Sequence, residues 1–167
     1  MPLSTRLLFD LAADLTTVLD LQSGTASLKR PIQYVWGSGT GANQADKIFA
    51  DQRTLTASST EDLDIAAGGL VDAFGVTFTV ARVRALLVEA AAANTNNVIV
   101  GGDANSVPFF GAATHTVSVR PGGLLALFAP DATGYAVTTG TGDIIQVANS
   151  GAGTSVTYNI VIVGASA

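Results

Sequence analysis

The sequence contains no cysteine, a single histidine and a single tryptophan. The absence of cysteine excludes disulfides, thiolate metal sites and thiol nucleophiles together. With one histidine, a zinc site would have to be completed by carboxylates alone, which is a rare arrangement. The residues therefore offer little to the usual catalytic and metal-binding motifs.

Charge is also scarce. Charged residues make up 13% of the chain, about half the usual share, and the net charge is −5. The basic residues are scattered, with only Lys29 and Arg30 adjacent, so no basic stripe is available to follow a phosphate backbone. We therefore expect no direct binding to nucleic acid.

Long apolar runs are missing as well. No segment reaches the roughly 18 apolar residues that a membrane span needs, and the run 85–93 is interrupted by Glu89. Residues 1–21 lack a basic start, and Asp10, Asp14 and Asp20 interrupt any apolar core of a signal peptide. We expect no membrane contact, and a chain kept in the cytoplasm unless it is carried out inside an assembly.

What the sequence does contain is alternation. In residues 76–80, 115–120 and the first half of 155–164, mainly apolar side chains alternate with polar ones. The second half of 155–164 is apolar on both faces, as in a strand buried between layers. From residue 70 onward, Gly, Asn, Asp and Pro separate these runs at short intervals. The pattern predicts an all-β fold, a jelly-roll-like antiparallel β-sandwich, rather than βαβ units.

We expect the sandwich to occupy residues 46–167, after a strand-rich N-terminal arm at 1–45. The strand-like pieces of the arm have the character of strands that add to a neighbour's sheet edge. Residues 79–94 are rich in Ala, but the alternation from Arg82 to Ala85 favours a long strand over a helix, with a bulge near Ala81–Arg82.

The stretch Gly-Ser-Gly-Thr-Gly-Ala at 37–42 fits the loose dinucleotide pattern G-x-G-x-x-A, and acids follow at 61–64. Such a loop works only where a strand feeds a helix whose N-terminus holds the pyrophosphate. Here the following residues offer at most a short helix before the next strand, and no G-K-[ST] is present. We interpret 37–42 as a flexible connector, a hinge where glycines give the chain turning freedom.

Two further groups invite a catalytic interpretation. Asp62 and Asp64 share one face of a predicted strand and could join a Ca²⁺ site or act as an acid–base pair, but a solvated strand face explains them more simply. His115 begins a strand without a G-x-S-x-G elbow, so we expect a hydrogen-bonded rim histidine. We predict no catalytic, cofactor-binding or metal-binding residue and no enzyme; a hydrolase acting through Asp62, Asp64 or His115 is the third-ranked hypothesis.

Aromatic residues are few and dispersed. The single tryptophan and the three tyrosines could form a stacking platform for sugars, and the pair Phe109–Phe110 lies in a predicted loop, where it would be buried under its own domain or a neighbouring subunit. The residues that we predict to contact a partner are Leu8, Phe9, Tyr34, Trp36, Phe109 and Phe110.

Four segments, at 39–55, 59–75, 94–102 and 121–166, together resemble small proteins encoded in the structural regions of tailed-phage and prophage genomes. The longest reads PGGLLALFAPDATGYAVTTGTGDIIQVANSGAGTSVTYNIVIVGAS. The resemblance covers roughly residues 37–166, and its motifs are structural, so it transfers no functional residue.

The resemblance implies a virion component, with a capsid decoration or cement protein as the leading role. The implied fold is a β-sandwich and the implied unit a homotrimer, located at the capsid surface and assembled in the host cytoplasm. Its implied partners are the major capsid protein and further copies of itself, without any cofactor. The alternative hypothesis is a tail or head-fibre domain that recognises a receptor or glycan.

Overall fold

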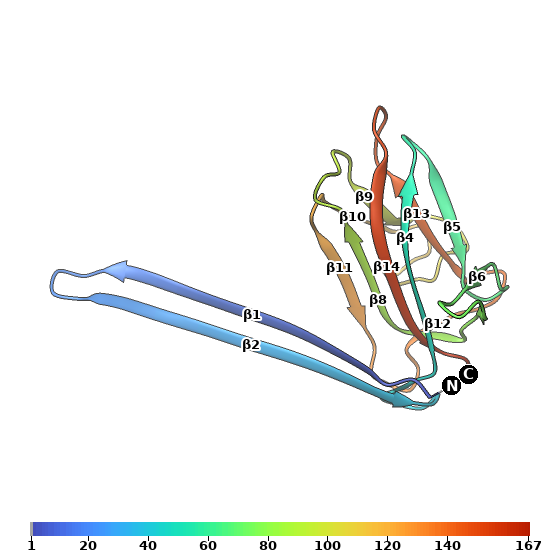
Figure 1. Cartoon of the computed structure of the whole chain (residues 1–167), viewed down its shortest axis with the longest axis horizontal. Helices are drawn as coiled ribbons and strands as arrows, with labels where there is room; N and C mark the ends of the chain where they lie inside the picture. Colours follow the sequence, from blue (N-terminus) through green and yellow to red (C-terminus); the bar gives the residue numbers. More distant parts are fainter. Residues whose placement is uncertain (1) are drawn as a thin grey trace.

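A long hairpin leaves the rest of the molecule at its N-terminal end, as the computed structural model of residues 2–167 shows (Figure 1). The hairpin consists of β1 (Thr5–Val18) and β2 (Ser23–Ser38). The remaining strands are β3 (Gln44–Ala45), β4 (Lys47–Leu55), β5 (Thr60–Asp64), β6 (Leu70–Val71), β7 (Thr77–Phe78), β8 (Arg82–Ala90), β9 (Val98–Gly101), β10 (Thr116–Val119), β11 (Leu124–Phe128), β12 (Tyr135–Ala136), β13 (Ile144–Asn149) and β14 (Val156–Ala165). Residues 2–167 contain no helix, and so none that would cross a membrane.

The body consists of two antiparallel sheets that pack face to face. One has the order β10-β9-β13-β5 and the other β11-β8-β14-β4, with β12 added to β8. Counting the eight main strands in chain order from β4, these orders read 5-4-7-2 and 6-3-8-1. Consecutive strands thus lie in opposite sheets except for the central pair β9 and β10, which is the strand order of a jelly roll. The predicted all-β, jelly-roll-like antiparallel sandwich is confirmed.

The core lies between the two sheets and is built by alternation. In β14 the side chains of Val156, Tyr158, Ile160 and Ile162 are buried against the opposite sheet. Towards its C-terminal end β14 is also covered on its outer face, where Val163 belongs to a second buried cluster with the base of the hairpin. The two-sided apolar character of 155–164 therefore reflects two layers, one on each face of the strand.

The segment 76–80 forms less strand than its alternation predicts. Only Thr77 and Phe78 pair with β6, because Gly75 turns the chain at positive φ just before them and the Val80 amide donates to Ile65 instead. Phe78 still enters the core, with its ring centroid 5.6 Å from that of Phe49. Val76 stays exposed at the end of the turn.

Residues 82–90 form strand β8, as predicted, and the bulge falls at Arg84. On β14, Val163 pairs with Ala85 and Gly164 with Val83, so Arg84 has no partner in the ladder. A bulge redirects a side chain, and here the Arg84 guanidinium is fully buried at the base of the body. Burial, together with the nearby Arg82, lowers the pKa of Arg84 below its ordinary value.

The buried guanidinium ties two loops together. Arg84 donates to the carbonyls of Thr40 and Gly41 at 3.0 and 2.9 Å, and to those of Asp131 and Ala132 in the loop after β11. A backbone hydrogen bond from the Asn43 amide to the Pro130 carbonyl also joins these two loops. The glycine-rich segment is thus a pinned turn rather than a flexible hinge, and the strand β4, not a helix, follows it.

Arg84→Ala should lower the free energy of unfolding by on the order of 3 kcal/mol, because it removes the hydrogen bonds to the carbonyls of Thr40, Gly41 and Asp131 and leaves a void where the buried side chain lies. Chemical denaturation measures the loss. Arg82→Ala is the matched control: Arg82 is partly exposed and makes one hydrogen bond, to Ala132 at 2.6 Å. Equal losses for the two variants would contradict the role given to Arg84.

Candidate functional site

The hairpin of β1 and β2, called the arm below, is the most unusual surface of the molecule. Its strands pair residue for residue from Thr5↔Trp36 at the root to Val18↔Ser23 at the tip. The tip is closed by a hydrogen bond of 2.8 Å from the Leu19 amide to the Gln22 carbonyl. Figure 1 shows that only the root touches the body, while the rest extends away from it.

One face of the arm is apolar along its length. Directly opposite residues point to the same face of a hairpin, so the register gathers one set of side chains. This set, called the apolar arm face, is Leu7, Phe9, Leu11, Ala13, Leu15, Ala26, Leu28, Ile32 and Tyr34. Arg30 is the one charged residue within it. The opposite face carries Arg6, Asp10, Asp14 and Lys29 beside the exposed Leu8, Val18 and Val35, so the arm is amphipathic, with charge concentrated on that face.

The root of this face is packed on the body. Trp36 is 1% exposed and lies in a cluster with Ala45, Ala85 and Val163 on the outer side of the sheet containing β8 and β14. Tyr34 stacks on the Trp36 ring with centroids 5.7 Å apart. Its other neighbour is Phe128, at 5.1 Å. The root is therefore a small core of its own, and it fixes where the arm leaves the body.

Beyond the root the same face meets no residue of the body. Phe9 is 46% exposed and Leu15 75%, and Leu11 and Leu28 are exposed to a similar extent. A two-stranded hairpin is marginally stable in water by itself, and a contiguous apolar patch on a soluble protein marks an interaction site. The free part of the arm thus has the composition of a surface that another protein covers.

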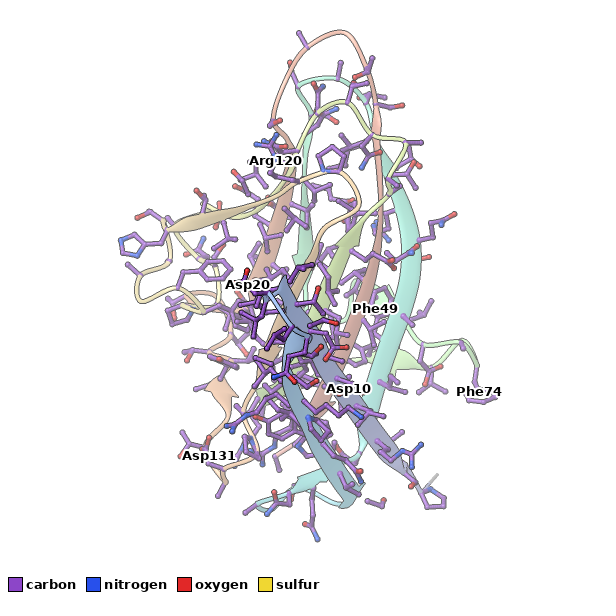
Figure 2. All side chains as sticks on the ribbon, turned by 90° about the vertical axis from the view of Figure 1, so that its left-hand side faces the viewer. Asp10, Asp20, Phe49, Phe74, Arg120 and Asp131 are labelled. Carbon is purple, nitrogen blue, oxygen red and sulfur yellow. The ribbon has the colours of Figure 1, made fainter. Side chains whose placement is uncertain are left out.

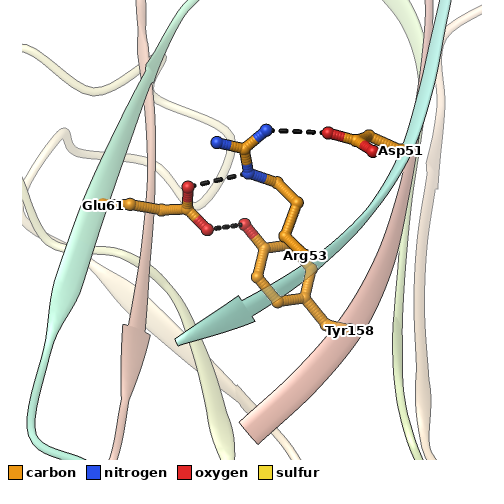
Figure 3. A network of polar contacts seen from close by, with 4 residues as sticks. All are labelled: Asp51, Arg53, Glu61 and Tyr158. Atoms are coloured by element: carbon orange, nitrogen blue, oxygen red, sulfur yellow. Dashed lines mark hydrogen bonds and ion pairs between the residues drawn. The ribbon is translucent and has the colours of Figure 1, made fainter. Parts of the chain in front are cut away.

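A second candidate is a polar network between the sheets, which Figure 3 shows. Glu61 of β5 accepts a hydrogen bond of 2.6 Å from the Tyr158 hydroxyl and one of 2.7 Å from Arg53 Nε. Arg53 also donates to Asp51 at 2.8 Å. Burial would lower the pKa of Arg53, but the hydrogen bond and charge of Glu61 outweigh it and raise that pKa.

The same network raises the pKa of Tyr158 far above its usual range, first through burial and then through the hydrogen bond to Glu61. A strongly perturbed group can mark an active site. Here, however, each Glu61 oxygen already accepts one donor of the network. The arrangement joins β4 and β14 of one sheet to β5 of the other, so it stabilises the packing of the two sheets.

Asp62 and Asp64 lie on β5 at one edge of a sheet, and His115 precedes β10 at the other edge; all three have structural partners. Asp62 accepts a hydrogen bond from Gln146 at 2.8 Å, and Asp64 accepts the amides of Ala66 and Ala67 in the turn after β5. The exposed His115 contacts the Phe110 carbonyl through Nδ1 at 2.8 Å. Within residues 2–167, no three His, Asp or Glu side chains come together as metal ligands.

The six predicted contact residues have three different environments. Leu8 and Phe9 are exposed on the arm, on opposite faces, and Tyr34 and Trp36 form its root. Phe109 and Phe110 pack against the main core, where the rings of Phe109 and Tyr135 make an edge-to-face contact with their centroids 5.1 Å apart. Since Trp36 and Tyr135 are separated and both packed, they do not form a common platform for sugars.

Sequence reasoning missed the apolar arm face itself, although its signal is present in the sequence. Phe9 and Leu11 flank the polar Asp10, and Leu28 lies between Ser27 and Lys29 on the returning strand, although Leu8 interrupts the alternation. What could not be seen was the pairing that places both sets on one side, because the tip has no Asn-Gly or Asp-Gly turn to fix the register.

The molecule is thus an eight-stranded jelly roll that carries a projecting, amphipathic arm. No protein-family model matches the sequence, and no curated protein matches it. Two solved structures are similar to it: "IMPa metallopeptidase in complex with T-antigen" (18% identity over 76% of this chain and 14% of that chain, TM-score 0.36) and "Structure of IMPa from Pseudomonas aeruginosa in complex with an O-glycopeptide" (16% identity over 75% and 13%, TM-score 0.35). The chain spans a small part of their length, and a likeness at this TM-score bears on neither fold nor activity.

Trp36→Ala should destabilise the root by about 3–5 kcal/mol, because the indole is buried between the arm and the sheet. Hydrogen exchange of the amides in β1 and β2, measured together with denaturation, locates the loss. Phe9→Ala is the control, since its exposed ring makes no contact with the body, and it should change stability little. A loss of similar size in both variants would show that the root is not a separate core.

The free energy of unfolding should fall as the pH rises above 10, because the unfolded chain releases the phenolic proton of Tyr158 at a lower pH than the folded chain does. A raised pKa means that the folded chain holds this proton more tightly, so its contribution is complete below pH 10 and is lost above it. Tyr158→Phe should flatten this fall and cost about 1–2 kcal/mol at neutral pH, because Glu61 loses a donor. Tyr34→Phe lies outside the network and should keep the steeper fall; the opposite result would remove Tyr158 as its cause.

Proposed function

We propose that this chain is a non-enzymatic structural subunit of a tailed-phage virion, which binds the capsid shell and stabilises it as a decoration or cement protein. The observation that carries the proposal is the arm, whose exposed apolar face requires a neighbouring protein. The sequence resemblance to phage structural proteins supplies the setting. The partners in this proposal are the major capsid protein and further copies of the chain.

The mechanism is mechanical bridging. A rigid jelly-roll body with a projecting arm contacts more than one neighbour at once, and the many copies on a symmetric lattice make modest contacts cumulative. A closed ring of copies matches a local symmetry axis of a shell, which favours a trimer as the unit. Each unit would thus span several shell subunits and resist the outward pressure of packed DNA.

The network around Glu61 is consistent with such a role. It holds β5 against β4 and β14 with charge-assisted hydrogen bonds across the sandwich. Charge-assisted bonds are stronger than neutral ones, so they oppose sliding of one sheet over the other. A subunit under mechanical load needs a body that transmits force without shearing.

The test is binding to empty heads of the phage or prophage whose genome encodes the chain. The chain should sediment with expanded heads and raise the temperature at which they disrupt, and Phe9→Asp should weaken both effects strongly. Leu8→Asp is the matched control, because Leu8 is also exposed but points to the opposite face of the arm. A chain that never sediments with heads would contradict the proposal.

The number of copies per virion, measured by quantitative mass spectrometry, separates shell decoration from the alternative role in a tail or head fibre. Hundreds of copies are expected for decoration. A handful would place the chain at a tail or vertex and would overturn the cement role.

A further inference from the structure

The body carries an apolar groove beside the free edge of β4. No strand within residues 2–167 pairs with the outer edge of β4, which bonds only to β14. Next to this edge lies a groove of about 460 Å³, lined by Leu3, Ile48, Ala50, Phe74 and Val76, with Asp46, Lys47 and Asp72 at its rim. A second hollow of about 340 Å³ continues it along β4 towards Arg53. This feature is called the β4 groove.

One wall of the groove is held in an exposed position by its own turn. The Asp72 carboxylate accepts the amides of Phe74 and Val76 at 2.9 Å, and Gly75 takes a positive φ. The turn therefore presents the Phe74 ring to solvent, 76% exposed, and Figure 2 shows it standing out from the body beside β4. Ile48 is also exposed on the opposite wall.

We propose that the apolar arm face of one copy docks in the β4 groove of a second copy, in a head-to-tail contact. This inference rests on the proposal that the chain is an assembly subunit, and it names the partner of the arm. The arm cannot fill the groove of its own chain, because the groove lies beside the N-terminal residue Leu3 at the root while the arm runs away from it (Figure 1).

The strand edges of the arm and the body are complementary. A free edge with unpaired amides and carbonyls is a template for another strand, and both β4, beside the groove, and β1, in the arm, are edge strands. The outer edge of β2 is less suited, because Pro31 has no amide to donate and pairs with Asp10 within an unbroken ladder. Addition of β1 to β4 would continue the sheet from the body of one copy into the arm of the next.

Charge supports the same partner. The apolar arm face has Arg30 as its one charged residue, and the rim of the β4 groove has two carboxylates, Asp46 and Asp72, against one Lys47. In the docked arrangement the positive charge of Arg30 would meet the net negative charge of the residues at the groove rim. Electrostatic complementarity of this kind steers the approach and fixes the register more than it adds affinity.

The area favours a ring over a single contact. Residues 9–18 and 23–32 form a face of roughly 300–350 Å², from about 3.3 Å per residue and two strands about 4.8 Å apart. A stable interface buries about 800 Å² per partner, so one arm alone is too small. In a closed head-to-tail ring each copy buries both its own arm face and its own groove, so the area buried per copy is about twice that of one arm face.

The absence of cysteine makes a cross-linking test clean. Leu15→Cys in one preparation and Phe74→Cys in another are mixed and treated with a short bis-maleimide. A covalent dimer joining the two variants should form several-fold more efficiently than with Thr16→Cys in place of Leu15→Cys, because Thr16 lies on the opposite face of the arm. Equal yields from the two arm positions would overturn the proposal.

Light scattering provides an independent measurement. Phe74→Asp should convert the assembled wild-type particle to monomer, whereas Leu124→Asp, at an exposed apolar residue on the far edge strand β11, should leave it assembled. A wild-type chain that is monomeric in solution yet sediments with heads would overturn this inference and leave the proposed function standing. Rings that form as described but never sediment with heads would overturn the function and leave the inference standing.

Discussion

The buried guanidinium of Arg84 is the interaction on which the arrangement of the two parts depends. A buried charge depends on hydrogen bonds that replace those of water. The two terminal nitrogens of Arg84 donate to carbonyls of two loops far apart in the sequence, whereas its Nε has no partner within residues 2–167. One loop ends the arm and the other follows β11. Movement of either loop would therefore break hydrogen bonds of the buried Arg84 guanidinium. The direction of the arm is thereby coupled to the interior of the sandwich.

The sheet containing β8 and β14 is covered by buried side chains on both of its faces. Its inner face carries Leu86, Val88, Ile160 and Ile162 into the main core. Its outer face receives the arm root through Ala85 and Val163. The jelly roll thus has a third, partial layer, and the arm face continues from that layer into solvent. The same face is therefore buried at the root and exposed beyond it.

Much of the body could be predicted from the sequence, because alternation in 155–164 and the turn-forming residues between runs report directly on a sandwich. The bulge was placed within a few residues, since the break in alternation is local. Three features could not be read in this way. The register of the arm depends on pairing between distant residues, the burial of Trp36 depends on which sheet the arm root meets, and the pinning of the glycine-rich loop depends on Arg84, more than forty residues further on. The glycine-rich composition suggested a flexible loop, whereas the buried Arg84 guanidinium donates hydrogen bonds to its carbonyls and holds it in place.

The length of the arm has a geometric consequence. The fourteen residue pairs of the arm correspond to a lever of about 45 Å, so a rotation of about 5° at the root moves the tip by roughly 4 Å. A two-stranded ribbon also twists more readily than a broad sheet. A small bend at the root therefore moves the tip by several ångströms without any repacking of the core of the body.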